Sequence, residues 1–126
     1  MKGVNNLKKK KNRYPPFVML PNELINSKAW KELSCYARVV YIEIKHKYNG
    51  KNDDNLSYTY REGIEIMSSK RLTKALGELV NNGLIDVVRS GGLYRKCTIF
   101  GLSDRWKSYD QENFKIGKLK VLDKNL

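Results

Sequence analysis

Apolar residues recur at helical spacing in two long stretches of the chain. The first stretch predicts a helix over residues 35–48, capped by Ser34 and stopped by Asn49 and Gly50. Its buried face would hold Ala37, Val40, Tyr41, Ile44 and Tyr48, which follow one another at helical intervals. A polar loop, residues 50–55, separates this helix from the rest of the chain.

The second stretch predicts a helix over residues 69–81, with Ser68 as its cap and Gly83 just beyond its end. Its apolar stripe would hold Leu72, Ala75, Leu76, Leu79 and Val80. At 100° per residue, the opposite face holds Lys70, Lys74, Gly77 and Asn81. This helix therefore has one face suited to a core and one face that is polar and cationic.

Strand patterns surround the second helix. Residues 84–89 and 93–100 are β-rich and are joined by Ser90-Gly91-Gly92, which predicts a hairpin. Residues 56–58 predict a short strand. A short helix to about residue 66 should follow, because Thr59 and Glu62 have the capping-box spacing. Its inward residues would be Tyr60, Ile64 and Met67, and Gly63 would lie where two helices approach closely.

The regions before and after these elements predict short turns. Pro21 suits a first helical turn with Leu24 and Ile25 facing the core, and Ser27 caps a second turn that carries Trp30. Trp106, Tyr109 and Phe114 should pack back on the domain. We therefore expect an α+β chain with one domain over residues 17–109. A basic disordered arm over residues 1–16 and a basic tail over residues 110–126 would flank it.

The net charge of +12 is unevenly distributed along the chain, and its distribution is more informative than its total. Residues 1–13 contribute +6 and residues 114–126 contribute +3. Within the remaining residues, the 69–101 segment has six basic and two acidic side chains, so the rest of that middle region is nearly neutral. A basic excess raises the local concentration of phosphate-bearing partners. The domain's own basic surface should therefore be the second helix and the hairpin.

The residues that carry enzyme chemistry are sparse. A single histidine, His46, and two separated cysteines, Cys35 and Cys97, do not form a zinc site of usual spacing, and no phosphate-binding glycine loop is present. The sequence therefore predicts no enzyme and no cofactor. The cysteine usage favours a reduced, cytoplasmic protein, and the short apolar runs predict no membrane span.

The helix and the hairpin together suit nucleic acid. Ser68, Ser69 and Lys70 lie at the amino end of the helix, where free N–H groups and the dipole favour a phosphate. Thr73, Lys74 and Asn81 have side chains that read base edges in a major groove. Arg89, Arg95 and Lys96 on the hairpin suit phosphates or a minor groove. The same features also occur as a solvated helix face and as charges that keep an edge strand from aggregating.

These residues carry a family resemblance. The chain resembles the winged helix-turn-helix superfamily in residues 56–58, the short helix, Met67-Ser68-Ser69 and the run 72–85 (LTKALGELVNNGLI). Residues 17–41 are similar to small winged-helix proteins of phages and plasmids, some of which are replication-initiator-like. The resemblance covers about residues 17–109. It implies a three-helix core with a β-hairpin wing and recognition-helix contacts from Ser68, Ser69, Lys70, Arg71, Thr73 and Lys74. It likewise implies wing contacts from Arg89, Arg95 and Lys96.

Three functions are compatible with these patterns. The first is a transcriptional regulator of a mobile element that binds double-stranded DNA. The second is a replication-origin-binding protein, and the third is a protein-binding module that inhibits a host complex. A homodimer is compatible with all three, and residues 17–33 and 102–116 are the segments that would form it.

Overall fold

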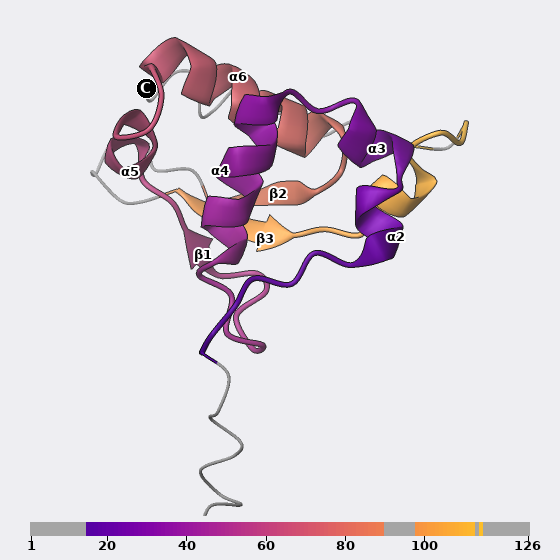
Figure 1. Cartoon of the computed structure of the whole chain (residues 1–126), viewed down its shortest axis with the longest axis horizontal. Helices are drawn as coiled ribbons and strands as arrows, with labels where there is room; N and C mark the ends of the chain where they lie inside the picture. Colours follow the sequence, from indigo (N-terminus) through magenta and orange to yellow (C-terminus); the bar gives the residue numbers. More distant parts are fainter. Residues whose placement is uncertain (1–14, 90–97, 113, 115–126) are drawn as a thin grey trace, which may run out of the picture.

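The computed structural model describes residues 15–89, 98–112 and 114 of the 126-residue chain. Within these residues, five α-helices and a three-stranded antiparallel sheet form an α+β fold (Figure 1). The expected fold class is confirmed at this level. Most of the predicted arm and tail, and the predicted hairpin tip with Arg95 and Lys96, lie outside the described residues.

Two single-turn helices begin the described fold, α2 (Asn22–Ile25) and α3 (Lys28–Lys31). The Ser27 hydroxyl accepts a 3.2 Å hydrogen bond from the Trp30 N–H, which is the cap that the sequence predicts. Leu24 and Trp30 are buried, but Ile25 is 40% exposed, so the prediction that Ile25 faces the core is wrong. The physical reason is that a single turn places only one of these two neighbouring residues against the core.

Helix α4 (Cys35–Lys45) starts as predicted and ends earlier than predicted. Ser34 caps it by accepting from the Ala37 N–H at 3.2 Å. The N–H groups of Lys47 and Tyr48 bond to carbonyls three residues back, which tightens the chain into a turn and ends the helix. Tyr48 is consequently 39% exposed, and its prediction as a core residue is wrong.

Strand β1 (Leu56–Ser57) leads into helix α5 (Tyr60–Ile64) through the predicted capping box between Thr59 and Glu62. The helix stops at Ile64, not at residue 66, and Ile64 is 46% exposed, so its inward prediction is wrong. The predicted close approach at Gly63 is confirmed, because a Cβ there would lie 2.6 Å from Leu72 Cδ1.

Lys47 joins the end of α4 to the following two elements. Its Nζ donates to the Ser57 carbonyl at 2.6 Å and pairs with the Glu62 carboxylate at 2.5 Å. Burial acts to raise the pKa of Glu62, but the hydrogen bonds from Lys47 and Thr59 outweigh it and hold the pKa below its ordinary value. The charged form of Glu62 is therefore the form that the fold stabilises.

Helix α6 (Ser69–Asn81) matches the prediction at both ends. Ser68 caps its amino end, and all five residues of the predicted apolar stripe are buried. At its carboxyl end, Gly83 adopts φ of 86°, and the Leu84 N–H donates to the Leu79 carbonyl at 2.9 Å. Glycine is needed there for a second reason, since a Cβ would lie 2.7 Å from the Trp106 nitrogen.

Strands β2 (Ile85–Arg89) and β3 (Ile99–Leu102) pair antiparallel, as the hairpin prediction requires, and β1 pairs with the other side of β3. The sheet order is therefore β1-β3-β2, with an irregularity between Val87 and Arg89. In Figure 1, α4 crosses in front of this sheet, and α6 lies across the end of α4 where α4 begins.

A 3₁₀ turn, η1 (Arg105–Ser108), closes the described fold and buries Trp106. Arg105 donates to the Asp86 carboxylate at 2.6 Å and to the carbonyls of Val80 and Ile85. Through these bonds one side chain joins the end of α6 to the start of β2. The position of the β2–β3 pair relative to α6 is therefore fixed by polar contacts as well as by the core.

Candidate nucleic-acid interface

The amino-terminal half of α6 brings six of the predicted site residues together. Ser68 holds the helix start by accepting from the Arg71 N–H at 3.3 Å. The exposed side chains of Ser69, Lys70, Arg71 and Lys74 follow within two turns. Their positive charges therefore lie at the end of the helix where the peptide dipoles are also positive.

A shallow hollow of about 410 Å³ adjoins these cations. It is lined by Ser34, Tyr36, Lys70, Arg71, Lys74 and Glu78, so it lies between the start of α4 and the outer side of α6. The Arg71 guanidinium stands over the Tyr36 ring, 4.4 Å from its centroid. Such stacking restricts the guanidinium while leaving its N–H donors at the edge of the plane for a partner.

Glu78 is the acidic residue of this hollow, and its carboxylate is already bonded. It accepts from the Ser34 backbone N–H at 2.7 Å and from the Ser34 hydroxyl at 3.0 Å. It therefore joins α6 to the capped start of α4 and lies at a helix terminus that favours negative charge. With Glu78 held in this way, Lys70, Arg71 and Lys74 make the outer edge of the hollow positive.

Thr73 is only partly exposed, and its hydroxyl donates to the Ser69 carbonyl at 3.0 Å. With the hydroxyl hydrogen used inside the helix, the oxygen and the methyl group remain for a partner. A base contact by Thr73 would therefore be made as an acceptor or through the methyl group.

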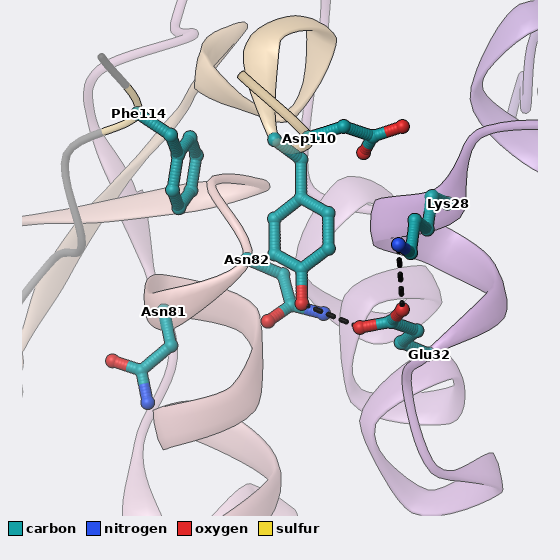
Figure 2. Close-up of a pocket in the computed structure, with 7 residues that line it drawn as sticks. Lys28, Glu32, Asn81, Asn82, Asp110 and Phe114 are labelled. Carbon is teal, nitrogen blue, oxygen red and sulfur yellow. Dashed lines mark hydrogen bonds and ion pairs between the residues drawn. The ribbon is translucent and has the colours of Figure 1, made fainter. Parts of the chain in front are cut away.

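Asn81 does not lie with the other predicted residues. It is 12 residues after Ser69, which at 1.5 Å per residue is about 18 Å along the helix. Figure 2 shows it beside Asn82 at a separate pocket of about 390 Å³, lined by Lys28, Glu32, Asn81, Asn82, Tyr109, Asp110 and Phe114. The structure thus brings Asn81 close to α3 and η1, at the far end of α6 from the cations.

That second pocket is built from hydrogen-bonded groups (Figure 2). The Tyr109 hydroxyl donates to Glu32 at 2.6 Å, and Lys28 lies 3.8 Å from the same carboxylate. The hydrogen bond to Glu32, with a smaller contribution from burial, raises the pKa of Tyr109 to about 12. Asn82 donates to the Ala29 carbonyl at 2.9 Å. The polar groups of this pocket mainly join α3, α6 and η1 to one another.

The predicted wing residues are described only in part. Arg89 is exposed at the end of β2, directly after the irregularity in the sheet. Arg95 and Lys96 lie outside the described residues, so their predicted role stays a prediction. Of the three predicted wing residues, the structure therefore describes only Arg89.

Sequence reasoning missed Tyr36 and the bonded state of Glu78. Tyr36 lies outside the apolar face of its helix, and its contact with Arg71 joins residues 35 positions apart in the chain. The contact of Glu78 with Ser34 spans 44 positions. Local patterns carry no signal for contacts of this kind; only the packing of α4 against α6 creates them.

In residues 15–89, 98–112 and 114, no group of three or more His, Cys, Asp or Glu side chains is placed to hold a metal ion. None of the helices described here has the length and apolar character needed to cross a membrane. The chain matches no protein-family model, no curated protein and no solved structure.

Proposed function

We propose that this chain is a winged-helix protein that binds double-stranded DNA and inserts α6 into the major groove. The observation that carries the proposal is the exposed cationic half of α6, followed directly by an antiparallel strand pair. Helices α4, α5 and α6 and then β2 and β3 follow in the order that the winged-helix resemblance implies. A helix of about 10–12 Å diameter fits a major groove about 12 Å wide.

The residues of this interface divide into two roles. Ser68, Ser69 and Lys70, at the helix start, contact a backbone phosphate, because free N–H groups and positive charge meet there. Thr73 and Lys74, further along the exposed side, face base edges. Arg71, stacked on Tyr36, contacts a second phosphate with a guanidinium that is already oriented.

Asn81 has no base-reading role in this proposal. A groove-inserted helix contacts bases mainly with its amino-terminal residues, and Asn81 lies at the opposite end, beside α3 and η1. Arg89 contributes a phosphate contact from the wing, and Arg95 and Lys96 extend that contact if the hairpin follows the groove.

The biological role that we propose is regulation of transcription in a mobile element. Origin binding is the alternative with the same DNA chemistry. Mapping the bound sites separates the two, because a palindrome over a promoter supports regulation and clustered repeats beside an origin support replication. A host-protein complex that survives nuclease treatment, from a chain without DNA affinity, would instead support the protein-binding function.

The test of DNA binding uses two double variants with the same net charge. Lys70→Ala with Lys74→Ala removes two proposed contacts, and Lys51→Ala with Lys107→Ala removes two exposed lysines on the polar loop and on η1. We expect only the first pair to weaken binding. That pair should also reduce the slope of log K against log salt by about 0.9, because Lys70 contacts a phosphate and Lys74 faces a base edge. Equal effects of both pairs would show that net charge alone drives binding and would refute the proposed interface.

A further inference from the structure

Helix α4 has a second ordered face that the DNA interface does not use. Its exposed positions include Cys35, Val39 and Ile42, and exposed His46 directly follows its last residue, so the four are spaced by four, three and four residues. We call these four residues the α4 stripe. Val39 is 45% exposed and Ile42 is 39% exposed, although both are large apolar side chains. The spacing is that of a coiled-coil seam, with Val39 at an a position and Ile42 at a d position.

Contacts on both sides of α4 turn this stripe away from the protein core. On one side, Arg38 donates to the Lys31 carbonyl at 3.1 Å and lies over the Trp30 ring. On the other side, Glu43 accepts from the Tyr58 hydroxyl at 3.2 Å. Figure 1 shows α4 in the foreground, with no other described helix or strand in front of it.

The flanking charges favour one orientation of a symmetric pair. With Val39 at a, Arg38 occupies a g position and Glu43 the e position five residues later. In a parallel two-stranded pair, each g residue faces the e residue five positions on in the partner, so Arg38 of one protomer would face Glu43 of its partner, and the reverse. In an antiparallel pair like flanks meet, and Arg38 would lie near Lys45 of the partner. The charges therefore complement each other only in the parallel pair.

We propose that the α4 stripe is a homodimer surface on which two copies of this chain pack their α4 helices in parallel. The partner is thus a second copy of the chain, and the proposal stands whether or not the protein binds DNA. A seam of about three helical turns is smaller than a standard stable interface, so the pair should be weak in free solution.

The parallel arrangement has a geometric consequence. The start of α4 is bonded to α6 through Ser34 and Glu78, so α6 lies at the amino-terminal end of α4. A two-fold axis along α4 would place both α6 helices at the same end of the dimer. An antiparallel pair would place them at opposite ends. Only the parallel pair could present both helices to one DNA duplex, and such binding would stabilise the dimer.

Cysteine cross-linking without DNA tests this geometry directly. In a Cys97→Ser background, Cys35 occupies a d position and would face Cys35 of the partner across the axis, whereas an antiparallel pair would place it opposite His46. A short bismaleimide should therefore link two Cys35 residues at least about tenfold faster than a control pair. The control combines Cys35→Ser with Val88→Cys, an exposed position on β2 that is 53% accessible. Equal rates would overturn the proposal.

Sedimentation of charge variants tests the pairing of Arg38 with Glu43. Arg38→Glu and Glu43→Arg should each shift the monomer–dimer equilibrium toward monomer, and the double reversal should restore the dimer. Circular dichroism checks that each variant is folded. Val39→Glu and Val88→Glu are a matched pair of exposed apolar-to-acidic changes, and only Val39→Glu, which lies in the α4 stripe, should shift the equilibrium toward monomer. Failure of the double reversal to restore dimer, with folded variants, would refute the parallel pairing. Affinity for a single DNA site is measured separately, so this result does not depend on the DNA interface.

Discussion

Substitution of Gly63 by alanine tests the contact that positions α6. Gly63 lies in α5, and a Cβ built on it would come within 2.6 Å of Leu72 Cδ1 and 3.0 Å of Leu72 Cγ. Leu72 is fully buried in α6, so its side chain has little space into which to move. Overpacking of this kind costs about 1–3 kcal/mol.

Helix propensity acts in the opposite direction. Alanine is favoured over glycine inside a helix by at most about 1 kcal/mol. With the full propensity gain subtracted from the overpacking cost, Gly63→Ala is expected to lower the free energy of unfolding by up to about 2 kcal/mol. The sign is informative, because propensity alone would make the same substitution stabilising.

Urea denaturation followed by circular dichroism measures this change, with an unchanged slope showing that the transition remains comparable. Gly77→Ala is the control, since Gly77 is in the interior of α6 but away from its buried stripe. It should be neutral or stabilising. If Gly63→Ala were stabilising, as helix propensity alone predicts, α5 would not pack on Leu72, and the arrangement of α5 and α6 would be wrong.

Three further predictions concern polar contacts. Glu78→Ala should lower the free energy of unfolding by about 1–2 kcal/mol, because the Ser34 N–H and hydroxyl lose their acceptor, and Glu78→Gln should cost less; thermal unfolding measures both. Because the folded protein holds the pKa of Glu62 below its ordinary value of 4.5, the ionised carboxylate stabilises the fold above that value, and this contribution is lost as pH falls through the lower folded pKa. Between about pH 7 and about pH 3, the free energy of unfolding should therefore fall more in the wild type than in Glu62→Gln. An equal fall in both proteins would contradict the contact of Glu62 with Lys47. In a spectrophotometric titration, Tyr109→Phe should remove the signal of one phenol that ionises near pH 12. If the signal removed by this substitution instead ionised near pH 10, the hydrogen bond from Tyr109 to Glu32 would not form in solution.

The local elements of the fold were predictable from the sequence because their signals are local. The Ser68 cap, the stripe beginning at Leu72 and the glycine stop at Gly83 lie within 16 consecutive residues, and each acts on its immediate neighbours. Errors arose at short elements. Ile25 and Ile64 lie in helices of one turn or little more, where periodicity does not distinguish the inward side from the outward side.

Only the part of the candidate interface that lies on the single helix α6 was predictable from the sequence. The exposed cations at Lys70 and Lys74 follow from helical spacing, and both are exposed as expected. The stacking of Arg71 on Tyr36 and the separation of Asn81 from the other residues depend on how α3, α4 and η1 pack around α6. These contacts join distant parts of the chain, so sequence spacing could not reveal them.

Selection of bound sequences from random duplex DNA is the most direct test of the proposed α6 interface. The wild-type protein should enrich a short motif, and Lys74→Ala should relax the preference at one or two neighbouring positions, since that side chain is proposed to face base edges. Lys51→Ala, which removes the same charge from the polar loop, should keep the full motif. Failure to enrich any motif, or an unchanged motif with Lys74→Ala, would contradict the proposal that α6 reads DNA.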